Sequence, residues 1–279
     1  MSIWYAICDL IPLEMLSWTF MRNALLAVIL IAPLFGLTST MVVTGRMSFF
    51  SDALGHSAFT GIAIGTICGF AFPSVAAIIF AVVFALLFSF VRNRSNQAAD
   101  TLIGVFSCAA VALGIFIATL GGGSFTKYNK YLIGDILSVT GSEIGILAIV
   151  LVAVIIFWIF ASSHLTLCAI HPQLASSRGI NVATTQTVFT VAIAIIVTLS
   201  ISWVGLLILN SLLVLPGAAS RNIAKNIKQY NIYSVIFALI AGITGLFISY
   251  YLGSSAGAAI SLVLALLFLF TFLLRKEKN

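Results

Sequence analysis

The stretch MSFFSDALGHSAFTGIAIGTICGF, residues 47–70, reads as a membrane-spanning helix that carries two ionisable side chains. Nearly all of its residues are apolar, small or hydroxyl-bearing, yet Asp52 and His56 lie four positions apart. At about 100° per residue they are separated by only about 40° around a helix, so they share one face and could bind one ion together. An acid at mid-membrane costs roughly 2.5–3.5 kcal/mol, which is tolerated where it faces a water-filled path or a ligand.

The composition of the chain indicates a membrane protein. Its 279 residues are 62% hydrophobic and only 7% charged, whereas a soluble globular chain is about a quarter charged. At about 20 apolar residues per crossing, the length allows roughly eight or nine spans and no large soluble domain. The sequence therefore predicts an all-α polytopic membrane protein. Its basic residues mark the ends of apolar runs, as topology signals do, and do not indicate nucleic-acid binding.

Nine apolar runs are candidate spans. They are residues 18–43, 47–70, 73–91, 101–120, 144–161, 185–203, 204–219, 232–251 and 256–274. The seventh is short and is the weakest of them. With nine spans, ten of the thirteen Lys and Arg residues fall on one side, which the positive-inside rule assigns to the cytoplasm. We therefore prefer nine spans to eight, with the N-terminus outside.

The chain divides into a short N-terminal segment and one large membrane domain. Residues 1–17 contain Asp9 and Glu14 and lack a basic start, so they do not read as a cleavable signal peptide. With Trp4 and Tyr5 they are predicted to lie as an amphipathic segment at the membrane interface. Residues 18–279 are predicted to form a single transmembrane domain.

The ligand types of Asp52 and His56 favour a transition metal. An imidazole nitrogen with a carboxylate oxygen suits Zn, Mn or Fe(II) better than Na or K. Two ligands are too few for a closed zinc site, which takes four, but an incomplete, exchangeable site suits a translocation path. The alternative is that Asp52 is a first-turn acid stabilised by the helix dipole, with His56 hydrogen-bonded to a neighbouring helix.

The glycines of the same stretch predict close helix packing. Gly61, Gly65 and Gly69 form a ladder of small residues every fourth position. Their mean direction lies roughly 200° from the Asp52–His56 pair. We expect this side of the helix to approach a neighbour closely.

A short helix is predicted on the cytoplasmic side, between the fifth and sixth spans. Pro172 fits the first turn of a helix and Gly179 fits its C-terminal stop, which gives about two turns. Such a helix is either an ordinary loop helix or an element that a partner protein can push. The sequence contains no GxxxxGK[ST] motif, so P-loop ATP hydrolysis would require another polypeptide. We therefore expect a transporter subunit, not an enzyme.

Six segments, in order along the chain, resemble the membrane permeases of zinc, manganese and iron ABC importers. SDALGHSAFTGIAIG, residues 51–65, is similar to the family helix that reads close to GDALSHAVLPGIALA. IHPQLASSRGI, residues 170–180, resembles the family's DPELARAIG helix. The other four segments are ADTLIGVFSCAAVALGIFI (99–117), YLIGDILSV (131–139), SWVGLLILNSLLVLPGAASR (202–221) and SYYLGSSAGAAISLVLAL (249–266).

The resemblance implies a fold, partners and a cargo. The fold would be that of a type II ABC importer permease in a bacterial cytoplasmic membrane. Two permease copies would form a homodimer and bind two copies of a cytoplasmic ATP-binding subunit, and an extracellular or periplasmic metal-binding protein would deliver the metal. The cargo would be zinc or manganese, with iron as a further candidate, and no permanently bound cofactor is expected.

The resemblance also implies roles for individual residues. Asp52 and His56 match the family's metal-coordinating acid and histidine. Residues 172–179 would be the coupling helix that docks on the ATPase, with these positions involved: Pro172, Gln173, Leu174, Ala175, Arg178 and Gly179. Asp100 is expected to cap the N-terminus of the fourth span. Asp135 faces outward and is a weaker candidate for receiving the metal.

This sequence departs from the family pattern at several positions. Phe59 and Thr60 replace a Leu-Pro pair, and His171 and Gln173 replace two acids of the coupling segment. A proton-coupled secondary metal carrier, with Asp52 and His56 as a relay, is the alternative function. Such a carrier has no need for a coupling helix, which makes residues 172–179 the feature that distinguishes the two.

Overall fold

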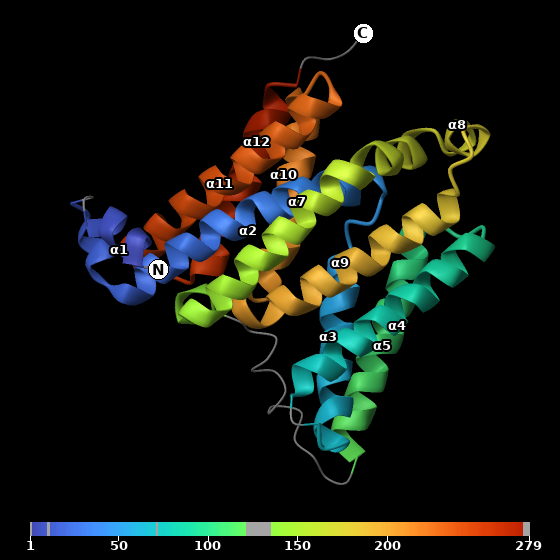
Figure 1. The fold of residues 1–279 in the computed structure, drawn as a ribbon, viewed down its shortest axis with the longest axis horizontal. Helices are drawn as coiled ribbons and strands as arrows, with labels where there is room; N and C mark the ends of the chain where they lie inside the picture. Colours follow the sequence, from blue (N-terminus) through green and yellow to red (C-terminus); the bar gives the residue numbers. More distant parts are fainter. Residues whose placement is uncertain (1, 10–11, 71, 121–134, 276–279) are drawn as a thin grey trace. The chain divides into compact units, whose positions relative to one another are not determined.

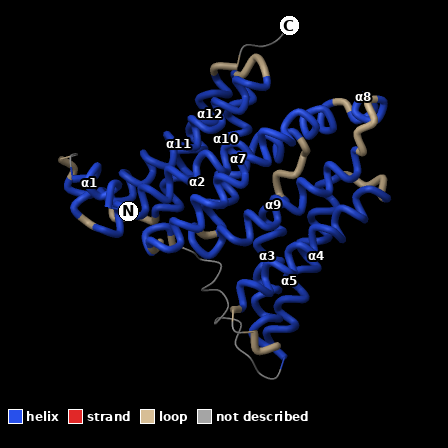
Figure 2. The backbone as a smooth tube through the Cα atoms, viewed as in Figure 1, coloured by secondary structure: helices blue, strands red, loops and turns tan. Residues whose placement is uncertain are grey.

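The computed structural model describes residues 2–9, 12–70, 72–120 and 135–275. Over these ranges the chain forms helices joined by short loops, without a β-strand (Figure 2). The helices are α1 (Ser2–Asp9), η1 (Glu14–Ser17), α2 (Thr19–Thr44), α3 (Phe50–Ile67), α4 (Pro73–Arg94), α5 (Ala99–Thr119), η3 (Ile136–Ser138), α7 (Gly141–Ile170), α8 (Pro172–Ser177), α9 (Val182–Val204), α10 (Leu206–Ile223), α11 (Ile227–Leu252) and α12 (Ala256–Leu273).

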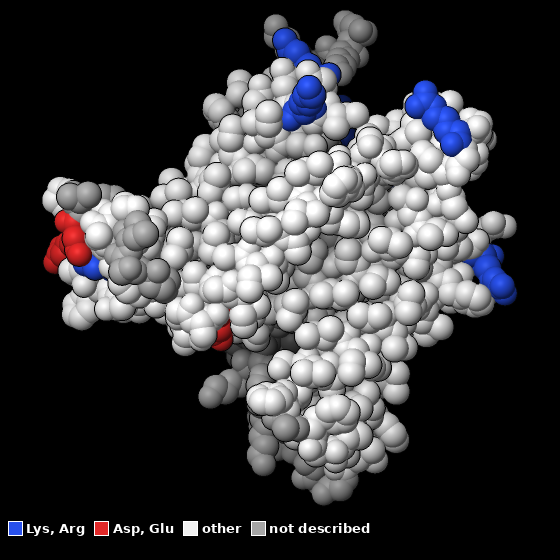
Figure 3. Space-filling model, viewed as in Figure 1, with Lys and Arg blue, Asp and Glu red and all other residues white. Residues whose placement is uncertain are grey.

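Eight helices in the described part of the chain are long and apolar enough to cross a membrane. They are α2, α4, α5, α7, α9, α10, α11 and α12. Most of the surface visible in Figure 3 is uncharged, as a lipid-facing surface requires. The predicted all-α, multi-pass architecture is therefore confirmed.

Helix α3 is also 18 residues long but is less apolar than these eight, because it contains Asp52, His56 and several hydroxyl and glycine residues. Its packing nevertheless places it along the length of α4. At one end, Arg92 of α4 contacts the loop before α3: its Nη1 lies 3.1 Å from Met47 Sδ. At the other end, Gly65 of α3 packs on Pro73, the first residue of α4. The two helices run antiparallel along the same length, and a ninth crossing by α3 stays a prediction.

The helices group into two compact units that interleave along the chain. Unit 1 contains Met1–Thr40, Asp135–Trp158 and Trp203–Asn279, and unit 2 contains Met41–Gly134 and Ile159–Ser202. In unit 2, α3 packs along both α4 and α5 (Figure 1). In unit 1, α10, α11 and α12 each contact the other two.

Glycines allow the close packing of α3 in unit 2. An added Cβ at Gly61 would lie 2.5 Å from Ala77 Cα, and one at Gly65 would lie 2.6 Å from Ala76 Cβ. Gly69 differs from the expected packing role, because a Cβ there would meet nothing within 4 Å. Its φ of +72° ends the helix instead, and the amide of Phe70 donates to Gly65 O at 2.9 Å, as in a glycine-terminated helix.

In unit 1, glycine again allows close helix packing, and neutral polar side chains form hydrogen bonds between the helices. An added Cβ at Gly245 of α11 would lie 2.6 Å from Ile260 Cα of α12. The Ser211 and Ser261 hydroxyls, on α10 and α12, are hydrogen-bonded at 2.7 Å. Asn222 Nδ2 donates to Thr271 Oγ1 at 3.2 Å between the same two helices. Small residues and hydroxyl or amide pairs therefore hold this bundle together.

Among the span boundaries that differ from the sequence prediction, two have a clear local cause. The fifth span was expected to end at residue 161, but α7 continues to Ile170. Residues 162–170 contain no Gly or Pro, so nothing stops the helix until Pro172 restricts the residue before it. The sixth and seventh spans were expected to meet at residues 203 and 204, but the break falls at Gly205. Its φ of 85° and ψ of 154° are accessible essentially only to glycine.

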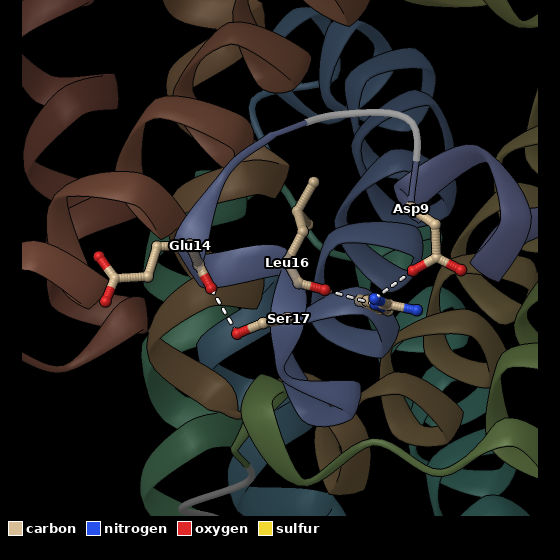
Figure 4. A network of polar contacts seen from close by, with 5 residues as sticks. Asp9, Glu14, Leu16 and Ser17 are labelled. Atoms are coloured by element: carbon tan, nitrogen blue, oxygen red, sulfur yellow. Dashed lines mark hydrogen bonds and ion pairs between the residues drawn. The ribbon is translucent and has the colours of Figure 1, made fainter.

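The N-terminal segment folds against the start of α2. Trp4 Nε1 donates to Arg22 O at 2.9 Å, and Tyr5 Oη donates to Asn23 Oδ1 at 2.8 Å. Arg22 forms an ion pair with Asp9, Nη2 to Oδ1 at 2.5 Å, and its Nε donates to Leu16 O (Figure 4). These bonds fix α1 to the body of unit 1, and its position at the membrane interface stays a prediction.

Candidate metal site and cytoplasmic helix

Asp52 and His56 lie next to each other on α3. Asp52 Oδ2 and His56 Nε2 are 3.5 Å apart, as the four-residue spacing in a helix requires. The two side chains are 47% and 33% exposed, respectively. An oxygen and a nitrogen ligand are thus available together at one point of the unit 2 surface.

The rest of this part of α3 is enclosed by protein. From Phe50 to Ala63, every residue except Asp52 and His56 is buried. One turn beyond His56, Thr60 Oγ1 donates to Ala110 O of α5 at 2.7 Å, and on the side of the helix away from the pair Gly61 packs on α4. Helices α4 and α5 both pack against α3, and the opening in the stretch 50–63 carries the two ionisable groups.

The pair lies near the start of α3. Asp52 is in the first turn of the helix, where the helix dipole stabilises a carboxylate by about 0.3–1 kcal/mol. His56 is one turn further along, about 6 Å from it along the axis. The dipole thus offsets part of the cost of the acid, as the alternative reading of the sequence anticipated. It does not account for a histidine at the same opening.

The described part of the chain contains no group of three or more His, Cys, Asp or Glu side chains that could hold a metal. A single copy therefore offers two side-chain ligands at Asp52 and His56, fewer than the four of a closed zinc site. The arrangement suits a metal that binds and leaves.

The short helix predicted between the fifth and sixth spans is present as α8 (Pro172–Ser177), and its cytoplasmic position stays a prediction. Pro172 is its first residue, and Gly179 follows its C-terminus with a φ of +76°. The amide of Ile180 donates to Ala175 O at 3.1 Å, which closes the helix end. Ala175 is fully buried, whereas the other residues of α8 are exposed, including Leu174 at 44%. The helix thus packs against the rest of the protein through Ala175, and its other side chains are exposed.

The two other acids singled out from the sequence have local structural positions. Asp100 does not cap α5: the N-cap is Ala98, without a side-chain hydrogen bond, and Asp100 is exposed in the first turn. The helix begins at Ala99, two residues earlier than capping by Asp100 would require. Asp135 caps η3, accepting from the Leu137 amide at 3.0 Å. Residues 131–134 of the external segment lie outside the described residues.

Comparisons with known proteins extend over nearly the whole chain. It is 28% identical over 258 residues to the high-affinity zinc uptake system membrane protein ZnuB of Haemophilus influenzae, covering 91% of this chain and 97% of that protein. It is 28% identical over 264 residues to the manganese import system permease protein ScaB of Streptococcus gordonii, covering 93% of each.

A solved structure shares the fold. The structure of PsaBC from Streptococcus pneumoniae in complex with Fab superposes with a TM-score of 0.78 at 25% sequence identity, covering 98% of this chain and 95% of that one. The expected type II importer-like permease fold is thereby confirmed. The apolar helices and these relatives identify a multi-pass protein of the bacterial cytoplasmic membrane.

A model of the ABC 3 transport family matches residues 17–275. The match begins just before α2 and ends just after α12, so it includes α3 with its ionisable pair and the exposed helix α8. The chain is a membrane subunit of the ABC 3 transport family.

Proposed function

We propose that this chain is the permease subunit of an ATP-driven importer of a divalent transition metal, zinc or manganese, with iron as a further candidate. Asp52 and His56 would contact the metal on its path. The zinc and manganese in the names of two relatives support this class of cargo. The observation that carries the proposal is the opening in the otherwise buried stretch 50–63 of α3, where a carboxylate oxygen and an imidazole nitrogen lie 3.5 Å apart.

The incomplete ligand set is consistent with a homodimer. Each copy supplies two side-chain ligands, so two symmetry-related copies facing a shared path would supply four, the number that zinc prefers. The metal would be delivered by an extracellular or periplasmic binding protein and released on the cytoplasmic side.

Helix α8 would couple this movement to ATP hydrolysis by a partner. It lies on the side that the positive-inside rule assigns to the cytoplasm, and its exposed surface includes the apolar side chain of Leu174. Two copies of a cytoplasmic ATP-binding subunit would dock here. Membership of an ABC transport family favours this reading over a proton-coupled secondary carrier, which needs no such helix.

The metal contact is tested by uptake measurements. Asp52→Asn and His56→Ala, in cells that produce the chain with its ATPase and binding protein, should each lower zinc or manganese accumulation at least about tenfold, because each removes half of the ligands. Asp100→Asn and His164→Gln are matched controls, since both replace exposed ionisable residues of the same unit. Near-normal uptake by both site variants at normal membrane levels would refute the site.

The coupling role is tested by ATPase activity. Leu174→Glu places a charge on the exposed face of α8 and should reduce the stimulation of ATP hydrolysis by metal-loaded binding protein several-fold. Gln97→Glu, in the exposed loop between α4 and α5, is the control for an added charge outside α8. If Leu174→Glu leaves stimulation unchanged, α8 is an ordinary loop helix.

A further inference from the structure

A cavity of about 240 Å³ lies within unit 2, and no residue of α3 lines it. It is formed where α2, α4 and α7 end and where α8 and α9 begin, and it includes the loop between α2 and α3. At about 30 Å³ per molecule it has room for roughly eight waters. Two arginines from different elements, Arg46 and Arg92, line it together with Gln186 of α9.

Arg92 has only weak partners within this cavity. Its side chain is partly buried, its Nη1 lies 3.1 Å from the thioether sulfur of Met47, and its Nη2 lies 3.4 Å from Gly45 O. Neither partner carries a charge. Among the described residues, the carboxylate contacts with basic side chains join Arg22 to Asp9 and His56 to Asp52, so neither cavity arginine is paired with a carboxylate there. A guanidinium has five N–H donors, and most of those on Arg92 remain available for an anion.

Arg46 occupies a backbone position that favours glycine. Its φ is 55°, and it is the only described residue other than glycine with a positive φ. The amide of Met47 donates to Val42 O at 2.9 Å and that of Arg46 to Val43 O at 3.3 Å, so Arg46 stands where a helix-ending glycine usually stands. Glycine would adopt this conformation without strain. An arginine retained in a strained conformation beside a cavity indicates a use for its side chain.

We propose that this cavity binds a phosphate group, carried by an anionic lipid of the inner leaflet or by a free anion. Arg46 and Arg92 would hold it with charge-assisted hydrogen bonds, and Gln186 would add a neutral donor. The cavity lies at the ends of α2, α4 and α7 that the positive-inside rule assigns to the cytoplasm, which is the side of the anionic inner leaflet. Basic pockets at the cytoplasmic ends of transmembrane helices are the usual binding places of such headgroups.

The position of the cavity gives the bound group a structural effect. Pro172, the first residue of α8, lines it, as does Met47 before α3. An occupied cavity therefore ties the base of the exposed helix α8 to the loop that leads to Asp52 and His56. The C-terminal helix dipoles of α2, α4 and α7 also stabilise nearby cations. The experiment must therefore distinguish arginines that bind an anion from arginines that are stabilised by these dipoles alone.

The test uses the purified full-length chain in neutral detergent after lipid removal. Phosphatidylglycerol at about a hundred times its dissociation constant should raise the thermal midpoint by about 5 °C or more. A glucosyl diacylglycerol, which has no phosphate, should not. Arg46→Gly should weaken phosphatidylglycerol binding about tenfold in a native mass spectrometry titration. This variant relieves the strained backbone, so it is expected to fold at least as well as the parent chain.

Matched variants decide between the outcomes. Arg92→Gln should weaken binding as Arg46→Gly does. Arg94→Gln removes a charge from the same end of α4, where Arg94 stacks over Phe90 at 4.4 Å outside the cavity, and should leave binding unchanged. If inorganic phosphate stabilises the chain as well as the lipid does, the source is a free anion. Equal weakening by Arg94→Gln, or no stabilisation by either phosphate compound, would overturn the proposal.

Discussion

The two helix groups around α3 and α12 are built alike and differ in their polar content. In unit 2, α3 lies between α4 and α5, which contact each other only slightly, and glycines bring the helices close. In unit 1, α10, α11 and α12 all contact one another, again with glycines at the closest approach. The polar pairs between α10 and α12 are neutral and satisfied by each other, whereas α3 places two ionisable groups at an opening.

The two kinds of polar group therefore have different roles: the neutral pairs stabilise the fold, and the ionisable pair is available for chemistry. Neutral hydroxyl and amide pairs inside a membrane bundle stabilise helix contacts at modest cost. Ionisable groups are expensive there and are retained where they have a task. Changes in the glycines should therefore affect both bundles alike, and changes in the polar groups should affect them differently.

The largest expected effect on stability comes from the glycine contacts. Gly61→Leu in unit 2 and Gly245→Leu in unit 1 should each destabilise the fold by about 2–3 kcal/mol, because backbone atoms of the neighbouring helix lie within 2.6 Å of the added Cβ. Thermal unfolding in detergent measures the loss. Gly104→Leu is the control, since a Cβ there meets nothing within 4 Å. A tolerated Gly61→Leu would contradict the close contact of α3 with α4.

A smaller effect is expected from the hydrogen bonds between helices. Thr60→Val removes the 2.7 Å bond to Ala110 O in unit 2, and Ser211→Ala removes the 2.7 Å bond to Ser261 in unit 1. Each should cost about 0.6–1.7 kcal/mol in the same unfolding assay. Only Thr60→Val, one turn from His56, should also change metal uptake. Altered uptake in Ser211→Ala would contradict the interpretation that the polar pairs of unit 1 have a structural role only.

The smallest effect is expected at the N-terminal segment. Asp9→Asn removes the ion pair with Arg22, in which Asp9 is 62% exposed. Water and salt screen such a pair, so the unfolding free energy should fall by less than about 1 kcal/mol. Added salt should further reduce the difference in unfolding free energy between the parent chain and Asp9→Asn. A loss of several kcal/mol would show that α1 is part of the core of unit 1.

Much of the architecture follows from one-dimensional patterns. The length of each apolar run, the basic residues at its ends and the Pro and Gly around α8 depend only on neighbours in sequence, and they predicted most helices within a few residues. The Asp52–His56 pair was predictable for the same reason, since four-residue spacing in a helix leaves little freedom.

The features that were missed depend on contacts between distant residues. Arg92 meets the loop at Gly45 and Met47, 47 and 45 residues away, and no pattern around either segment indicates the cavity between them. The end of α7 was missed because the polar run Ser162, Ser163 and His164, followed by Thr166, lowered the local hydropathy without stopping the helix. Asp100 was assigned as a cap because a first-turn acid and an N-cap acid differ by only one or two positions.

The single residue between α9 and α10 constrains how the chain enters the membrane during synthesis. Helix α10 contains Asn210, Ser211 and Pro216, and it is among the shortest of the spanning helices. With only Gly205 between the two helices, α10 cannot wait outside the translocon while α9 moves into lipid. We expect the two helices to insert as a pair, so that the more apolar α9 compensates for the weak insertion of the helix that follows it.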